Sequence, residues 1–154
     1  MAFTATPYAA ELFQRATDGV DADIWDHQCQ GNAGDKFYVD GSVGFLFPEI
    51  YETKSDLLQI ALGHHLRAGD LELFVKNPPP AGVAIGAGVV DVKDPSPEPV
   101  EEIVGRIERV LEVLDPNQVV LMPDCGWMNR RRDTVWEKNR RLVEAANIVR
   151  RRYQ

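Results

Sequence analysis

Four short apolar runs alternate with helical stretches along this chain, and this alternation restricts its fold more than any other feature. The runs cover residues 22–26, 56–62, 82–92 and 118–122. The second run, DLLQIAL, is apolar almost throughout, which is typical of a strand that is buried on both faces of a parallel sheet. Strands that alternate with helices predict an α/β fold, in which helices cover a parallel sheet.

One helical pattern precedes the first run, and one follows each of the four runs. We expect helices at residues 7–18, 45–53, 71–76, 100–114 and 133–153. The stretch 100–114 has one apolar stripe at helical spacing, and Asp133 is a plausible N-cap of the last helix. At 154 residues the chain is one domain, 1–154. Four βα units are either a small open sheet or half of a (β/α)8 barrel, which needs eight.

The charge balance limits the partners of the chain. Twenty-four acidic against 17 basic residues give a net charge of −7, which argues against nucleic acid or an anionic membrane as a partner. The basic runs at 130–132 and 150–152 are interpreted as solvated loop or helix ends. No apolar stretch is long enough to cross a membrane, and the first residues do not have the pattern of a secretory signal. We therefore expect a cytoplasmic protein.

Residues that can do chemistry follow all four predicted strands. In parallel α/β folds these positions meet at one rim of the sheet, so side chains far apart in sequence can share a site. The residues in question are His27, Cys29, His64, His65, Asp91, Lys93, Asp124 and Cys125. The rim explains why the chain places its two cysteines after the first and last strands.

His27 and Cys29 form a His-x-Cys pair at a strand end, where a period of two puts both side chains on one side. A further thiol from another strand, Cys125, completes a set of imidazole and thiolate ligands typical of zinc. On spacing alone the alternative is two buried structural thiols. The glycines of Gly86-Ala87-Gly88 lie inside a predicted strand and are interpreted as points of close backbone approach.

Four motifs occur in an order that resembles the cobalamin-independent methionine synthase family. They are DHQCQGN, RAGDLELF, GVVDVKDP before an amphipathic helix, and LMPDCGW before EKNRRLVEAANIVR. The resemblance covers the chain from about Pro7 to its end and is to the C-terminal half of the family's catalytic barrel. It implies half of a (β/α)8 barrel and zinc-dependent transfer of a methyl or alkyl group to a thiol. Epoxyalkane:coenzyme M transferases are relatives within this resemblance.

The resemblance places His27, Cys29 and Cys125 on three zinc ligands of the family. Ala61 stands where the family has a glutamate as the fourth ligand. His64 or His65 could replace it, a substrate thiol or water could fill an open position, or the metal site could be lost. His64 and His65 could also belong to an ordinary polar loop.

Further roles follow from the same resemblance. Asp91 and Lys93 are the expected catalytic residues, because the family carries a proton-donating histidine beside this aspartate. Lys93 can instead donate the proton or hold an anionic substrate, or it is a solvated loop end. Asp124 and Trp127 are expected, with His64 and His65, to bind substrate, although Trp127 also fits a core position.

The resemblance also implies partners. A half-barrel leaves two sheet edges and an inner face open, so we expect a homo-oligomer, a partner chain that supplies the first half, or a place within a larger enzyme. The expected ligands are a small-molecule thiol acceptor and an alkyl donor, with zinc as cofactor. The alternative function is a non-catalytic remnant or regulatory subunit that has lost the metal site, and carbon–sulfur cleavage is a further reaction compatible with the same residues.

Overall fold

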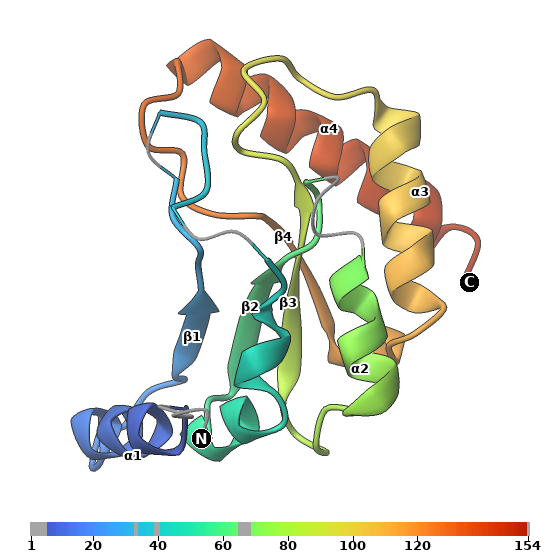
Figure 1. Cartoon of the computed structure of the whole chain (residues 1–154). Helices are drawn as coiled ribbons and strands as arrows, with labels where there is room; N and C mark the ends of the chain where they lie inside the picture. Colours follow the sequence, from blue (N-terminus) through green and yellow to red (C-terminus); the bar gives the residue numbers. More distant parts are fainter. Residues whose placement is uncertain (1–5, 33, 39–40, 65–68, 154) are drawn as a thin grey trace.

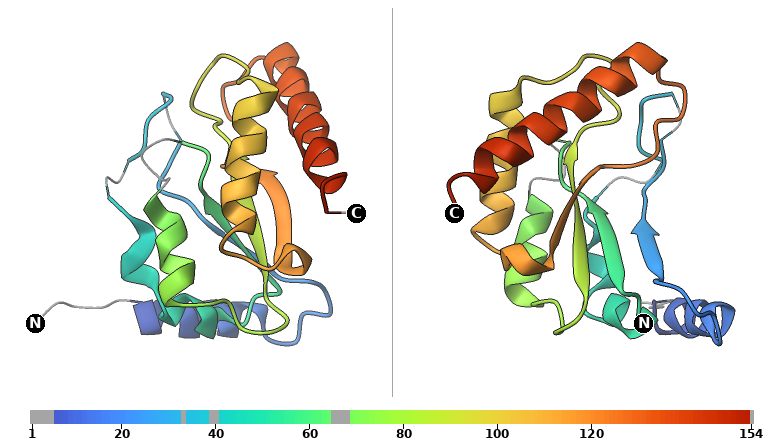
Figure 2. Two further views of the ribbon diagram at one scale, coloured as in Figure 1. Left: turned by 90° about the vertical axis from the view of Figure 1, so that its right-hand side faces the viewer. Right: turned by 180° about the vertical axis from the view of Figure 1, so that it is seen from behind.

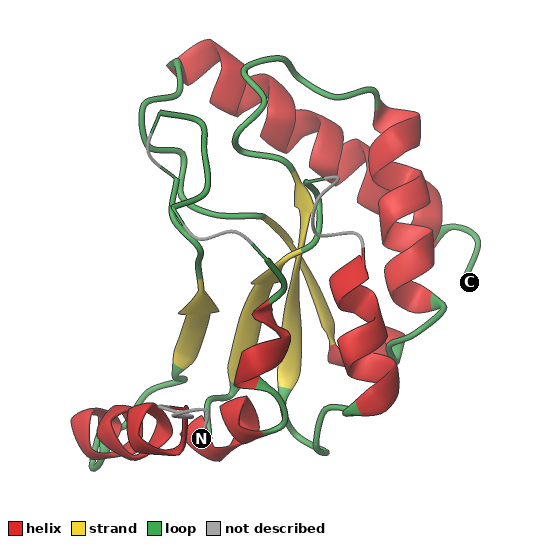
Figure 3. Cartoon of the chain, in the orientation of Figure 1, coloured by secondary structure: helices red, strands yellow, loops and turns green. Residues whose placement is uncertain are grey.

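The computed structural model describes residues 6–32, 34–38, 41–64 and 69–153. Strands and helices alternate along them (Figures 1 and 3). The helices are α1 (Thr6–Thr17), η1 (Val43–Leu46), η2 (Glu49–Thr53), α2 (Glu72–Lys76), α3 (Val100–Leu111), η4 (Pro116–Gln118) and α4 (Arg132–Arg150). The strands are β1 (Trp25–Gln28), β2 (Leu57–Ala61), β3 (Ala84–Val90) and β4 (Val119–Pro123).

The four strands form one parallel sheet in the order β1-β2-β3-β4. In the register His27 lies beside Gln59, and Ala61 lies beside Gly88. Every strand therefore ends at the same rim, which confirms the α/β fold with a parallel sheet that the alternation of strands and helices predicts.

The helices α2 and α3 cover one face of the sheet, and α4 packs along α3 (Figure 1). On β2, Leu58 and Ile60 point into this layer and belong to the hydrophobic core, whereas Gln59 and Ala61 are less buried. The opposite face of the strands is visible without a helix in front of β1 to β3 when the molecule is seen from behind (right panel of Figure 2). The molecule is thus a half-barrel with its would-be inner face open.

The stripe of α3 is confirmed, since Ile103, Val104, Ile107 and Val110 are all buried. A buried side chain of this size contributes roughly 1.5–3 kcal/mol relative to an exposed one. Together these contacts fix α3 behind β3, so that the loop between them opens at the rim.

Three local predictions were wrong. The stretch 45–53 is two short 3-10 helices, because Pro48 lacks an N–H and cannot continue an α-helix. The first strand covers residues 25–28 rather than 22–26, because pairing with β2 begins at Trp25. Arg131, not Asp133, is the N-cap residue of α4, and the Asp133 side chain instead pairs with Arg131.

The interpretation of the strand glycines is confirmed. A Cβ on Gly86 would lie 2.7 Å from the Met122 sulfur, and one on Gly88 would lie 2.8 Å from the Asp124 Cα. These distances are too short for any side chain, so the glycines allow β4 and its loop to approach β3.

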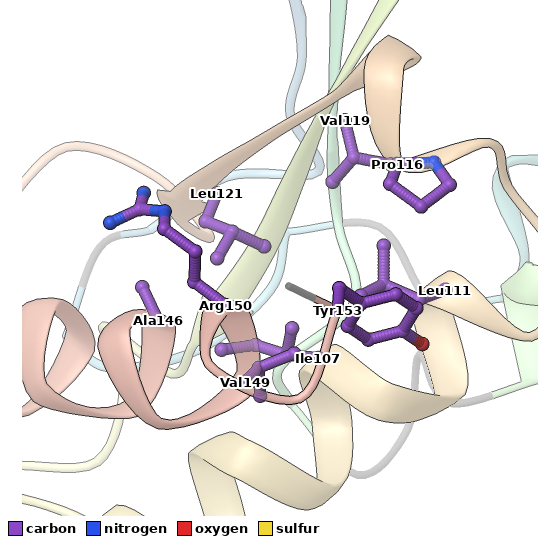
Figure 4. A pocket seen from close by; sticks show the side chains of 9 residues that line it. All are labelled: Ile107, Leu111, Pro116, Val119, Leu121, Ala146, Val149, Arg150 and Tyr153. Atoms are coloured by element: carbon purple, nitrogen blue, oxygen red, sulfur yellow. The ribbon is translucent and has the colours of Figure 1, made fainter.

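An apolar cavity of about 180 Å³ lies between α3, β4 and α4 (Figure 4). Pro116 and Val119 place it at the amino end of β4, away from the rim that carries Cys125. It is therefore separate from the predicted site. Within the described residues, no helix is both long and apolar enough to span a bilayer.

Candidate metal centre

The side chains of His27, Cys29 and Cys125 converge at the rim of the sheet. Their ligand atoms all lie within 4.8 Å of one another, and the two sulfur atoms are 3.3 Å apart. His27 is on β1, Cys29 follows that strand by one residue, and Cys125 follows β4 by two. The structure thus brings together the three residues that the sequence predicts as metal ligands.

The protonation of these residues suits metal binding. Partial burial lowers the pKa of His27, although the hydrogen bond that its imidazole donates to Gln59 raises it, and the net change favours the neutral imidazole that binds metals. Burial raises the pKa of the Cys125 thiol, as does its hydrogen bond to Cys29, whereas the charge of Lys93 lowers it. The Cys125 thiol therefore keeps its proton until a cation displaces it.

The cluster fits a zinc ion in ligand type and in size. Zinc binds thiolate sulfur at about 2.3 Å and imidazole nitrogen at about 2.0–2.1 Å, which puts tetrahedral ligand atoms roughly 3.3–3.8 Å apart. The observed ligand atoms lie within 4.8 Å of one another, so small side-chain rotations would bring them to that spacing. His27 and Cys29 are exposed, so the centre is open to solvent.

The fourth position of the centre has no protein ligand on β2. Ala61 follows Gln59 by two residues, so both point to the sheet face that carries His27. Gln59 bonds His27 and also donates to the Pro123 carbonyl at 2.9 Å. Gln59 therefore orients the imidazole of His27, a role that the sequence does not reveal, and Ala61 brings no carboxylate to this face.

Asp124 is 1% exposed, and its carboxylate binds the loop after β2. Oδ1 accepts the N–H groups of Leu62 and Gly63 at 3.1 and 2.8 Å, and Oδ2 accepts that of His64 at 3.1 Å. Burial raises the pKa of Asp124 to about 7, although the N–H of Gly63 lowers it. Asp124 thereby supports the rim, and its expected contact with substrate stays a prediction.

Lys93 is buried beside the cluster of His27, Cys29 and Cys125. It is 5% exposed, and its ammonium nitrogen lies 3.9 Å from the centroid of the Phe37 ring, a cation–π contact. The charge of Lys93 lowers the pKa values of His27, Cys125 and Asp124. The alternative interpretation of Lys93 as a solvated loop end is therefore wrong, because its side chain is buried and its ammonium group lies over the Phe37 ring.

Two of the other predicted residues lie close to Lys93. Asp91 is buried and accepts the Lys93 N–H at 2.7 Å, and its other oxygen is 3.9 Å from the Nε2 of His64. The His64 ring also packs edge-on against Phe37 at 4.9 Å. His64 thus belongs to the site region, whereas His65 lies outside the described residues.

Trp127 packs against the hydrophobic core, as the alternative for this residue predicts. Its role as the wall of a substrate pocket stays a prediction.

Two charged side chains near the rim are buried, which the sequence does not reveal. Glu98, just before α3, binds both Lys138 and Arg106. Arg130 was expected to be solvated, but its side chain is 7% exposed. One signal was available, since Lys138 lies four residues before the buried Leu142 and so falls in the apolar stripe of α4.

The fold and the site define an α/β protein, a parallel half-barrel that carries an imidazole and two thiols, ligand types suited to a soft metal ion, at the carboxyl ends of its strands. The family described as "Cobalamin-independent synthase, Catalytic domain" matches residues 3–148. The chain belongs to this family, which confirms the resemblance seen in the sequence.

Individual relatives agree with this assignment. The 2-hydroxypropyl-CoM lyase of Xanthobacter autotrophicus is 31% identical over 93% of the chain and 45% of that protein. The methionine synthase of Pyrococcus horikoshii is 32% identical over 94% of the chain and 39% of that protein. The chain therefore spans less than half the length of these curated relatives.

A solved structure shows the same fold. The B12-independent methionine synthase from Shewanella sp. W3-18-1, in complex with selenomethionine, superposes with a TM-score of 0.80 at 20% identity. The match covers 99% of this chain and 46% of the other. This extent supports the half-barrel architecture.

Proposed function

We propose that this chain provides the metal centre for zinc-dependent transfer of a methyl or alkyl group to a thiol. The observation that carries the proposal is the convergence of His27, Cys29 and Cys125 in a member of the cobalamin-independent synthase family. Zinc, when bound, keeps a coordinated thiol deprotonated near neutral pH and so makes it a nucleophile.

The neighbouring residues have separate tasks in this proposal. The Lys93 ammonium offsets the negative charge of the thiolates and, in the transfer, gives a proton to the departing group of the alkyl donor or holds an anionic substrate. Asp91 fixes the Lys93 backbone through the 2.7 Å hydrogen bond. The position opposite Ala61 admits the acceptor thiol. Because two thiols this close stay reduced only in a reducing compartment, the proposal includes a cytoplasmic location.

We further propose that the open sheet face packs against the first half of a (β/α)8 barrel, and that another polypeptide supplies this first half. The chain aligns with 39–45% of the length of these curated relatives. The remaining part of each relative is long enough to form the other half of a barrel. Trp25, 59% exposed, lies on the His27 side of β1, and Val120 is exposed on β4. Light scattering and a hydrophobic dye test this proposal. A monomer that binds no dye contradicts it, and a stable dimer indicates a second copy on this face.

The experiment that tests the metal centre is metal content per chain, on protein purified without chelator or histidine tag. We expect about one zinc per chain, and its loss in Cys125→Ala. Met128→Ala, an exposed change in the same loop, is the control and keeps the metal. The absence of metal after reconstitution under reducing conditions would favour the alternative function, a non-catalytic subunit in which Ala61 marks a lost site.

A further inference from the structure

Arg130 connects three loops at the rim of the half-barrel. It lies in the loop after β4, five residues beyond Cys125. Its Nε donates to the Val92 carbonyl at 2.8 Å and its Nη2 to the Lys93 carbonyl at 2.7 Å, both in the loop after β3. The same guanidinium pairs with the Asp35 carboxylate, in the loop after β1. A planar guanidinium with several donors is suited to such a junction, whereas an ammonium group is not.

The loop after β1 carries Cys29, and a second contact joins it to the loop after β4. The Asn32 amide donates to the Gly126 carbonyl at 3.1 Å. These two contacts, of Arg130 with Asp35 and of Asn32 with Gly126, lie within six residues of a cysteine, on the chain segments that set the separation of the two sulfur atoms. The cysteines themselves are exposed or half-buried, so their own packing contributes little to this separation.

The loop after β3 is fixed independently at its start. Lys138 donates to the Asp91 carbonyl at 2.8 Å, and Glu98 accepts the Asp91 N–H at 2.7 Å. Further along the same loop, the carbonyls of Val92 and Lys93 accept hydrogen bonds from Arg130. Arg130 is therefore anchored to a rigid part of the fold, and it transmits that rigidity to the loop after β1.

We propose that Arg130 is a positioning residue that holds the loop of Cys29 against Cys125 and holds Lys93 beside them, so that the metal centre is assembled before any ligand binds. The role in metal binding depends on the proposed function, but the positioning of the two thiols does not. Arg130 touches neither the metal ligands nor a substrate in this proposal, and it acts through Asp35 and the β3 loop.

The first test uses metal-free protein. Two thiols held together react with glutathione disulfide to form one protein disulfide and two molecules of glutathione, and the equilibrium constant reports how closely the protein holds them. We expect a fall of about tenfold, or ~1.4 kcal/mol, in Arg130→Met. Arg130→Lys and Asp35→Asn, which are milder, should shift the constant in the same direction.

Arg141 offers a matched control. Like Arg130 it donates to two backbone carbonyls, those of Pro97 and Glu98, and pairs with one carboxylate, that of Glu137. It lies on α4, and its contacts involve neither cysteine-bearing loop. Arg141→Met should leave the glutathione equilibrium unchanged. Equal shifts in the two arginine variants, or no shift in Arg130→Met, would overturn the proposal, and if Arg130→Met does not fold, Arg130→Lys and Asp35→Asn decide.

The second test is titration with Co²⁺ followed by its absorption spectrum, in which thiolate charge-transfer bands report ligation by sulfur. Changes in residues that orient metal ligands typically cost 10–100-fold in metal affinity. We expect about tenfold weaker binding in Arg130→Met and none of this loss in Arg141→Met. If the wild-type chain binds no Co²⁺ while the glutathione equilibria differ as expected, the metal proposal fails and the positioning role stands.

Discussion

The fully buried ammonium group of Lys138 lies 2.6 Å from a carboxylate oxygen of Glu98, and the two side chains bind both backbone polar groups of Asp91. This pair joins α4 to the loop before α3 and to the end of β3. It therefore couples the helical layer to the rim where Lys93 lies.

Removal of one partner of this pair should be costly, because it leaves the other charge buried. We expect Lys138→Met or Glu98→Gln to lower the free energy of unfolding by roughly 3–5 kcal/mol. Lys76→Met removes an exposed pair with Glu72 and should cost no more than about 1 kcal/mol. Urea unfolding of the three variants measures the difference, and similar values would contradict a structural role for the buried pair.

The same pair makes a prediction about pH. Burial alone would raise the pKa of Glu98, but hydrogen bonds from Lys138 and Arg106 lower it below its ordinary value of 4.5. A lowered folded-state pKa stabilises the fold fully above the unfolded pKa, and this contribution disappears as the pH falls through the folded value. Wild-type stability should thus decrease below about pH 4.5 more steeply than that of Glu98→Gln. Parallel curves would show that Glu98 does not titrate with folding.

Gly88→Ala should destabilise the chain by roughly 1–3 kcal/mol, since the new methyl group would meet the Asp124 backbone at 2.8 Å. Gly105, within α3, has nothing within 4 Å of an added Cβ. Gly105→Ala should instead stabilise by roughly 0.5–1 kcal/mol, because alanine favours helix. Thermal and urea unfolding distinguish the two, and a neutral Gly88→Ala would mean that β4 can move away from β3.

Asp124→Asn replaces an acceptor of three backbone N–H groups by an amide that carries its own donors. We expect a loss of about 1–3 kcal/mol, as one amide hydrogen would face an N–H of residues 62–64. Asp94→Asn, an exposed residue that accepts the Ser96 N–H, is the control. Amide hydrogen exchange at Gly63 offers a local readout, and unchanged protection would contradict the contact.

Ala61→Glu should strengthen metal binding if the fourth position of the centre is open. A carboxylate there adds a ligand to one imidazole and two thiolates, and we expect at least about tenfold higher zinc affinity, or ~1.4 kcal/mol. Ala81→Glu places the same charge in an exposed turn and controls for general electrostatic attraction. Equal affinities in both variants would show that position 61 does not face the metal.

Local patterns predicted most of the fold. The strands β2, β3 and β4 and the helix α3 follow from apolar runs and from one stripe at helical spacing. The strand β1 was misplaced, because it has only four residues and includes Asp26 and Gln28, which break the apolar signal. The residues of the 3-10 helices around Pro48 have the composition of an α-helix, but they do not form its backbone hydrogen bonds.

The convergence of His27, Cys29 and Cys125 could be predicted because parallel strands end at a common rim, whereas their role as metal ligands comes from the resemblance to the family. The supporting residues could not be predicted, because a charged side chain shows no partner in the sequence. Glu98 and Lys138 are 40 residues apart, and Arg130 binds a carboxylate 95 residues away. Only the packing of helices and loops on the sheet decides that these side chains are buried.

The distance between the two sulfur atoms also reflects the curvature of the sheet. Cys29 and Cys125 follow β1 and β4, the outermost strands, which would be about 14 Å apart across three strand spacings if the sheet were flat. Their 3.3 Å separation agrees with a sheet that curls at its carboxyl end, so that the segments after β1 and β4 meet. A bond between these sulfurs, direct or through a metal, would therefore fix the curvature of all four strands, and any change that flattens the sheet would move the sulfur atoms apart.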